Sequence, residues 1–78
     1  MSYPKLKLKK NEDRRILAGH LWVFSNEVDT KSTPLNKFEP GEIVTVTSQN
    51  DRPLANAYIN PHSLISARVF SHSVKQAL

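Results

Sequence analysis

The sequence has no cysteine, and this absence removes several kinds of stabilisation and chemistry. A chain of 78 residues is near the size at which a hydrophobic core alone suffices, and many small folds add disulfides or a metal. Neither disulfides nor thiolate ligands are available here, and His20, His62 and His72 are too far apart for a local zinc pattern. We therefore predict one small domain that its apolar core stabilises unaided.

Glycine is scarce, with only Gly19 and Gly41 in the chain. A loop that cradles phosphates, or a dinucleotide fingerprint, needs several glycines close together. No thiol nucleophile exists, and no serine stands in a recognisable pattern with a histidine and a carboxylate. We expect this chain alone to be no enzyme, to have no catalytic residue, and to bind neither a cofactor nor a metal.

A long hydrophobic run is also missing. The N-terminus "MSYPKLKLKK" places lysines between single leucines, which is unlike a signal peptide or a membrane span. We expect a protein that does not contact membranes and that resides in the cytoplasm.

Acidic residues are few at the N-terminal end, so the positive charge is concentrated there. Residues 1–15 hold six basic and two acidic side chains, whereas the other 63 residues hold five of each, and the whole chain carries +4. Such asymmetry is typical of a face that binds a polyanion, and it is also found in ordinary solvated surface. Charge alone leaves both interpretations open. The six basic residues are Lys5, Lys7, Lys9, Lys10, Arg14 and Arg15.

The segment that follows the lysines predicts a short helix. "KLKLK", residues 5–9, alternates like a strand with one buried face, and its three lysines would line the other face. Asn11 is a good N-cap, and Gly19 is suited to end the helix in a left-handed conformation, which predicts about two turns. Free N–H groups at the start of this helix would assist the cations in meeting phosphates.

Arg14 and Arg15 are neighbours on this predicted helix. Consecutive side chains project about 100° apart around a helix axis, so at most one arginine lies flat on the fold. The other is expected to face outward.

The rest of the chain is typical of a mainly β domain with short helices, of the α+β class. Strands are predicted at 21–24, 41–49, 54–59 and 64–70, with a loop from 29 to 40. In the second of these, Thr45 and Thr47 would occupy the face opposite the apolar residues. Asn50 and Asp51 tolerate positive φ and predict a hairpin turn. With residues 5–9, this spacing suits a small, partly closed barrel.

Trp22 and Phe24 are predicted to enter the core, because a tryptophan within "LWVF" is more often buried than free to stack on a base. Tyr58 is likewise expected to be buried with its hydroxyl satisfied. Arg68 interrupts an apolar strand, so it lies on the outer face or pairs with an acid across the sheet.

Three segments, "RRILAGHLWVFSNEV", "PGEIVTVTS" and "PLANAYINPHSLISARVF", carry a family resemblance. Their order and spacing resemble the N-terminal PUA-like domain of the bacterial SAM-dependent ribosomal RNA large-subunit (cytosine-5) methyltransferase family. The sequence departs from this family at Leu21, which replaces a frequent proline, at 50–52, which replaces a glycine-containing turn, and at Asn56, where glycine is common.

The resemblance implies a PUA-like pseudo-barrel of about five to six strands over residues 1–72. This module would position structured RNA for a catalytic domain that binds S-adenosylmethionine and is absent from the chain. Residues 73–78, "SVKQAL", would begin a linker or helix toward that domain, and the alternative is that they are only a frayed terminus. The expected partners are RNA, specifically large-subunit ribosomal RNA, and the protein's own C-terminal catalytic domain.

The candidate RNA-binding residues are the basic side chains around the predicted helix, together with the histidine that follows it. The alternative is a small barrel that docks another protein or its own catalytic domain without binding RNA, and whose basic face serves solubility only. The candidates are Lys7, Lys9, Lys10, Arg14, Arg15 and His20.

Overall fold

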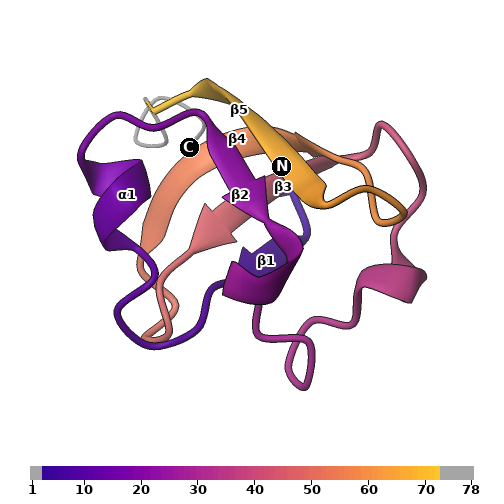
Figure 1. The fold of residues 1–78 in the computed structure, drawn as a ribbon, viewed down its shortest axis with the longest axis horizontal. Coiled ribbons are helices and arrows are strands. Elements are labelled where there is room, and N and C mark those ends of the chain that lie inside the picture. The colour runs from indigo at the N-terminus through magenta and orange to yellow at the C-terminus, as the bar shows by residue number, and fades with distance from the viewer. Residues whose placement is uncertain (1–2, 73–78) are drawn as a thin grey trace.

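The computed structural model describes residues 3–72 and contains five strands within that range (Figure 1). A single helical turn and two 3-10 turns, η1 and η2, connect them. The predicted mainly β fold is therefore confirmed. In chain order the elements are β1 (Lys5–Lys7), α1 (Arg14–Leu17), β2 (Trp22–Phe24), η1 (Ser25–Glu27), η2 (Leu35–Lys37), β3 (Ile43–Thr47), β4 (Pro53–Ile59) and β5 (Ile65–Ser71).

The strands form one curled sheet in the order β1-β3-β4-β5-β2, in which only β1 and β3 are parallel (Figure 1). The segments that follow the two edge strands meet through a bridge between Leu8 and Val28. On either side of this bridge, the N–H of Lys9 donates to the carbonyl of Glu27 (2.9 Å) and the N–H of Asp29 donates to the carbonyl of Lys7 (2.8 Å). These contacts draw the two edges together, which confirms the partly closed barrel.

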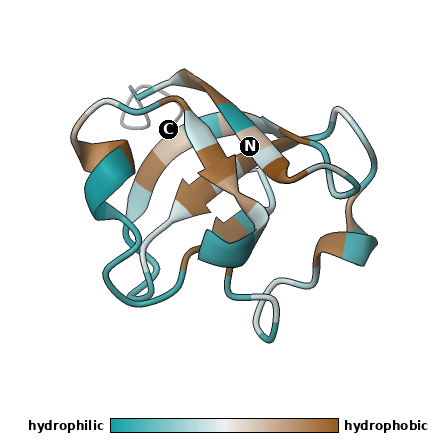
Figure 2. Ribbon diagram, in the orientation of Figure 1, coloured by the Kyte–Doolittle hydropathy of each residue, from teal (hydrophilic) through white to brown (hydrophobic). Residues whose placement is uncertain are grey.

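Aliphatic residues fill the inside of the curl, and they appear as brown bands along the strands in Figure 2. Leu6 and Leu8 are both buried, as the alternation in residues 5–9 predicts. Burial of such side chains is the main favourable term in folding. The core consists of Leu6, Leu8, Ile16, Val23, Val28, Val44, Val46, Leu54, Ala55, Ala57, Ile59, Ala67 and Val69.

Two predicted left-handed positions are confirmed. Gly19 has a φ of 100°, and its N–H donates to the carbonyl of Ile16 while the N–H of His20 donates to the carbonyl of Arg15, both at 3.0 Å. This pair of bonds is a Schellman motif, which ends α1. Asp51 has a φ of 63° in the hairpin turn between β3 and β4.

The predicted helix is wrong in length and in its N-cap. α1 has four residues, and the N-cap position belongs to Asp13, whose side chain makes no capping hydrogen bond. Asn11 has a φ of 68°, so it turns the chain instead of capping the helix. Asparagine tolerates this conformation better than most residues do. One turn offers no helix-start anion site, which removes that part of the expectation.

Expectations about which side chains enter the core are wrong at four positions. Trp22 and Tyr58 are each 49% exposed and Phe24 is half-buried, because the alternation along β2 and β4 turns Val23 and Ile59 inward instead. Thr47 is fully buried although it was assigned to the outer face. A register shift between Val46 and Thr47 breaks the alternation there.

Arg68 is exposed on the outer face, as predicted, and the 29–40 segment is a loop apart from η2. No helix within residues 3–72 has the length and apolar character needed to cross a membrane. The predicted linker or helix at 73–78 lies outside the described residues.

Candidate nucleic-acid interface

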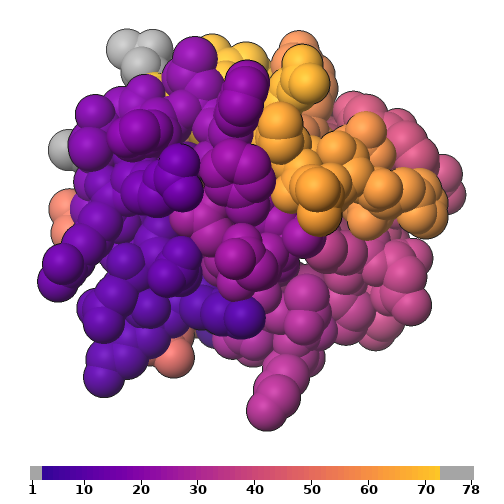
Figure 3. All heavy atoms as spheres, viewed as in Figure 1, coloured from indigo at the N-terminus to yellow at the C-terminus, as the bar shows by residue number. Residues whose placement is uncertain are grey.

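An open groove of about 460 Å³ separates the turn that precedes α1 from the hairpin turn between β3 and β4. Lys10 lies on one wall and Arg52 on the other, and the remaining lining is polar apart from the acidic Asp13. We call this hollow the basic groove. Figure 3 shows the indigo and violet N-terminal segment covering the left side of the face in view. The other lining residues are Asn11, Ser48, Gln49 and Asn50.

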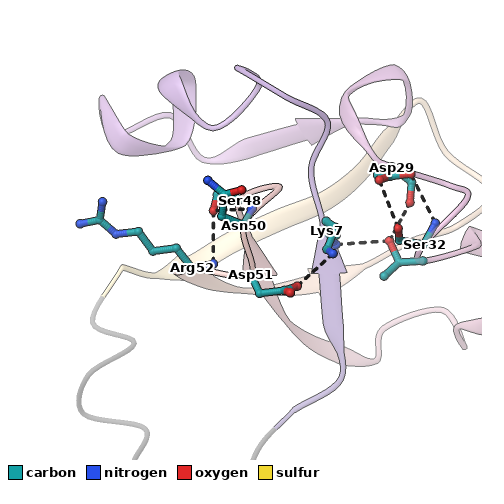
Figure 4. Close-up of polar contacts among 8 residues, drawn as sticks. Lys7, Asp29, Ser32, Ser48, Asn50, Asp51 and Arg52 are labelled. Atoms are coloured by element: carbon teal, nitrogen blue, oxygen red, sulfur yellow. Dashed lines mark hydrogen bonds and ion pairs between the residues drawn. The ribbon is translucent and has the colours of Figure 1, made fainter.

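Ser48 holds the hairpin wall of the basic groove in shape. This buried side chain accepts hydrogen bonds from the N–H groups of Asn50 (3.3 Å) and Arg52 (3.2 Å), and its own N–H donates to the carbonyl of Arg52 (2.9 Å). Figure 4 shows the Arg52 guanidinium extended away from this turn. The backbone of Arg52 is thus restrained while its charged end remains available to an anion.

Each wall of the basic groove is bent by a left-handed residue that is not glycine, Asn11 on one side and Asp51 on the other. Such conformations cost about 1–3 kcal/mol in general, and they persist where the surrounding contacts hold them. At Asp51 the holding contact is visible, because its carboxylate forms an ion pair of 3.1 Å with Lys7 (Figure 4). Lys7 therefore ties β1 to the hairpin, and its side chain is only 21% exposed.

The two arginines of α1 have different surroundings, as the helical spacing predicts. The Arg15 guanidinium lies 3.9 Å from the buried carboxylate of Glu27 and 5.2 Å from the centre of the Phe24 ring. Glu27 in turn accepts a hydrogen bond of 2.8 Å from the N–H of Phe24. Arg14 is exposed and forms no ion pair within residues 3–72. Arg14 is thus the arginine that faces outward.

A carboxylate stabilises the loop that follows η1, close to Lys7. Asp29 accepts hydrogen bonds from the N–H groups of Lys31 (3.2 Å) and Ser32 (3.3 Å), and from the Ser32 hydroxyl (3.2 Å; Figure 4). The N–H of Ser32 makes the largest contribution to lowering the pKa of Asp29 below its ordinary value, and the charge of Lys7 adds a small one. Asp29 therefore keeps its negative charge beside the cationic β1.

The comparison with known families decides what kind of domain carries these features. The family model of the PUA-like domain matches residues 6–72, which is most of the chain. The chain belongs to the PUA-like domain family.

Curated relatives of this PUA-like domain are much longer proteins. It is 34% identical over 70 residues to "Ribosomal RNA large subunit methyltransferase I" of Salmonella arizonae, and 39% identical over 69 residues to the protein of the same name from Vibrio cholerae. These matches cover 90% and 87% of the chain but 17% and 16% of the relatives. The chain thus spans about a sixth of the length of these methyltransferases.

A solved structure shares the fold of this PUA-like domain. It comes from Streptococcus mutans and is assigned to the SAM-dependent methyltransferases. The TM-score is 0.64 at 15% sequence identity, and the match covers 90% of this chain and 17% of the other. At this level of identity the likeness establishes the fold alone.

Within this PUA-like domain the predicted basic residues divide into two groups. Lys9, Lys10 and Arg14 are exposed and form no ion pair within residues 3–72, whereas Lys7 and Arg15 each face a carboxylate. His20 is exposed at the far end of α1, where its N–H completes the Schellman motif.

Sequence reasoning missed Arg52, which the fold brings to the basic groove opposite Lys10. The position of Arg52 directly after Asp51, a residue predicted to adopt positive φ, could have indicated an exposed cation, because the tip of a hairpin presents its side chains to solvent. The surrounding segment has no excess charge, so counting charges did not reveal it. The cations on the two walls of the basic groove can bind a polyanion. Within residues 3–72 there is no cluster of potential metal ligands.

Proposed function

We propose that this PUA-like domain is the RNA-binding module of a SAM-dependent methyltransferase that modifies cytosine C5 in large-subunit ribosomal RNA. The observation that carries the proposal is a set of exposed cations without ion pairs within residues 3–72, placed on both walls of one groove. The names of the relatives and the share of them that the chain covers support the same assignment. The proposal includes a cytoplasmic location for the protein, because its proposed substrate is ribosomal RNA.

In this function the cations without ion pairs contact phosphates, and the ion-paired cations hold the surrounding structure in position. Lys9, Lys10 and Arg14 meet the RNA backbone together with Arg52. Lys7 holds the hairpin wall through Asp51, and Arg15 joins α1 to Glu27 of η1. Phosphate contacts of this kind set the orientation of the RNA and carry no sequence information by themselves. The PUA-like domain thus brings RNA to the catalytic part of the protein without selecting the target base through these contacts. His20 is proposed as a contact at the edge of the same surface.

The S-adenosylmethionine site is proposed for the part of the protein outside this chain. The two glycines lie in separate turns, each with a positive φ that the turn requires, so residues 3–72 do not fit a glycine-rich cofactor loop. We therefore assign no catalytic step to these residues.

A salt titration of RNA binding tests the proposal. The 78-residue chain is titrated with a hairpin taken from large-subunit ribosomal RNA at several salt concentrations. We expect the logarithm of the binding constant to fall linearly with the logarithm of salt concentration. Lys10→Ala and Arg52→Ala, one from each wall of the basic groove, should each weaken binding and reduce this slope by about 1, because each removes one phosphate contact.

Lys31→Ala and Lys37→Ala are matched controls, because both lysines are exposed in the 29–40 loop, outside the lining of the basic groove. If they weaken binding as much as the groove variants do, the attraction is due to overall charge and the groove has no special role. If the chain binds no RNA at low salt, the docking alternative replaces the proposal.

A further inference from the structure

No aromatic side chain of this small fold is fully buried, although Phe38 packs against the core. The chain has six aromatic side chains, and the structure describes every one of them. Phe24 and Phe38 are half-buried, and the other four are between 41% and 49% exposed. Aromatic rings carry the largest hydrophobic surface of any side chains, so a group of them on the surface points to a binding role. The exposed four are Tyr3, Trp22, Tyr58 and Phe70.

Three of these rings lie around one arginine on the outer face of the sheet. Arg68 on β5 is directly opposite Trp22 on β2 and directly opposite Tyr58 on β4. Residues paired in this way have their side chains on the same face of a sheet. Phe70 extends the set, because its ring centre lies 4.6 Å from that of Tyr58. We call Trp22, Arg68, Tyr58 and Phe70 the outer aromatic row.

The charge around the outer aromatic row favours an anionic ligand. None of the five strands contains an aspartate or a glutamate, and Arg68 forms no ion pair within residues 3–72. The row is also continuous with α1, because the Trp22 and Phe24 rings meet edge to face at 6.4 Å and Arg15 lies over Phe24. Two arginines and four aromatic rings therefore form one continuous surface from α1 across the sheet.

A small hollow of about 220 Å³ opens beside Tyr58 and Arg68, at the end of the sheet where β4 turns into β5. Its lining includes the polar residues Asn60 and Ser63. The Ser63 hydroxyl oxygen accepts a hydrogen bond of 3.2 Å from the N–H of Ile65, which leaves its hydroxyl proton available. The Asn60 side chain is exposed and offers both donors and an acceptor. These groups match the polar edge of a nucleobase.

We propose that the outer aromatic row binds unpaired nucleotides of the RNA. The rings of Trp22 and Tyr58 stack on bases, Arg68 contacts a base face or a phosphate, and the hollow receives the edge of one base. Stacking of this kind requires bases that are not in a duplex. The inference rests on the proposed RNA-binding function. It adds to the basic groove a second RNA-binding surface, the outer aromatic row. This row would make the domain prefer single-stranded RNA, whereas the basic groove alone imposes no such preference.

Trp22 provides a direct probe, because it is the only tryptophan of the chain. The unmodified 78-residue chain is titrated with a single-stranded mixed-sequence RNA and, separately, with a perfect duplex of equal phosphate number, while Trp22 emission is followed. We expect the single strand to quench the emission and the duplex to leave it nearly unchanged. This measurement requires no variant, so it does not depend on how a substitution affects folding.

Affinity measurements then separate the two surfaces. Tyr58→Ala should weaken single-strand binding about tenfold, since a stacked base contributes about that much, and should leave duplex binding within about twofold. Arg68→Gln should act in the same direction. Leu64→Ala is the matched control, because Leu64 is 80% exposed, apolar and outside the row; we expect no effect, and circular dichroism verifies that each variant is folded.

Two results would overturn the inference, and they differ from a failure of the proposed function. If single-stranded RNA binds but leaves Trp22 emission unchanged and tolerates Tyr58→Ala, the row takes no bases while RNA binding through the groove stands. If the methyltransferase part of the protein changes Trp22 emission and no RNA does, the row is a protein-docking face. If neither RNA binds at low salt, the proposed function itself fails.

Discussion

The two faces of the curled sheet use different kinds of apolar side chain. On the inner face small and branched residues pair across strands, as in Val44 with Ala57, Val46 with Ala55 and Ile59 with Ala67. On the outer face Trp22 and Tyr58 are paired with Arg68. The inner pairs are buried and the outer rings are about half exposed.

The difference shows how a sheet this small divides its apolar residues. Its radius of gyration is 10.8 Å, and its closely packed core is built from aliphatic side chains, with an alanine as the partner of a branched residue in the three pairs above. A ring added to such a core would overpack it, which generally costs about 1–3 kcal/mol. The inner face therefore determines stability, and the outer face is free to serve binding.

Ile59 and Tyr58 are adjacent on β4 and face opposite sides, so they form a matched pair. Ile59→Ala should lower the free energy of unfolding by about 2–5 kcal/mol, because it empties space in the core. Tyr58→Ala should lower it by about 1 kcal/mol through the loss of cross-strand ring contacts. Urea denaturation measures both values. Equal losses would show that the two faces do not differ in this way.

Glu27 is the one buried carboxylate within residues 3–72, and it adjoins the contacts that close the barrel. Glu27→Ala leaves the N–H of Phe24 without its side-chain acceptor, so we expect a loss of about 1–3 kcal/mol. Glu27→Gln keeps an acceptor and should lose less. Arg15→Ala should cost under about 1 kcal/mol, because the Arg15 side chain is 50% exposed and its ion pair of 3.9 Å is screened by solvent. Thermal unfolding of the three variants would reveal a different order if the ion pair dominated.

A substitution at Thr47 tests how much a buried hydroxyl group affects the stability of the fold. Its Oγ1 is buried and has no hydrogen-bond partner within residues 3–72. Thr47→Val keeps the shape of the side chain and removes the unsatisfied hydroxyl, so the variant should be more stable by about 1 kcal/mol. Ser66→Ala is a useful contrast, because the buried Ser66 hydroxyl donates to the carbonyl of Ser63. A destabilised Thr47→Val would mean that this hydroxyl has a partner after all.

Asp29 gives the smallest effect and adds a pH dependence. Its pKa is lowered in the folded state, so the stabilisation is complete above the ordinary value of 3.8 and is lost as pH falls through the lower folded value. The stability difference between the natural protein and Asp29→Asn should therefore be constant near neutral pH and shrink in acid. Unfolding midpoints measured over that range test this, and a difference that grows in acid would have the wrong sign.

Much of the fold could be predicted because its signals are local. Alternation placed β1, β3, β4 and β5, and the conformational tolerance of Asp51 and the freedom of Gly19 placed two turns. The length of α1 was beyond reach, since a four-residue helix exists only through contacts such as those of the buried Ile16.

The candidate site was predictable in part. Helical spacing indicated that one of Arg14 and Arg15 would face outward, and a charge count found the basic end of the chain. Neither identifies which lysine meets a carboxylate: the Lys7–Asp51 pair joins β1 to a turn more than 40 residues later. Arg52 lines the groove because the fold brings the hairpin turn opposite the turn that precedes α1, which is far away in the sequence.

The sequence by itself determined the mainly β character, the order of the strands along the chain and the concentration of positive charge at one end, because these depend on near neighbours. Only the tertiary structure decided which apolar side chains became core. In "LWVF" every residue is apolar, so alternation has no polar partner to mark its outer side. The register of β2 against β5 turned Val23 inward and Trp22 outward, beside Arg68.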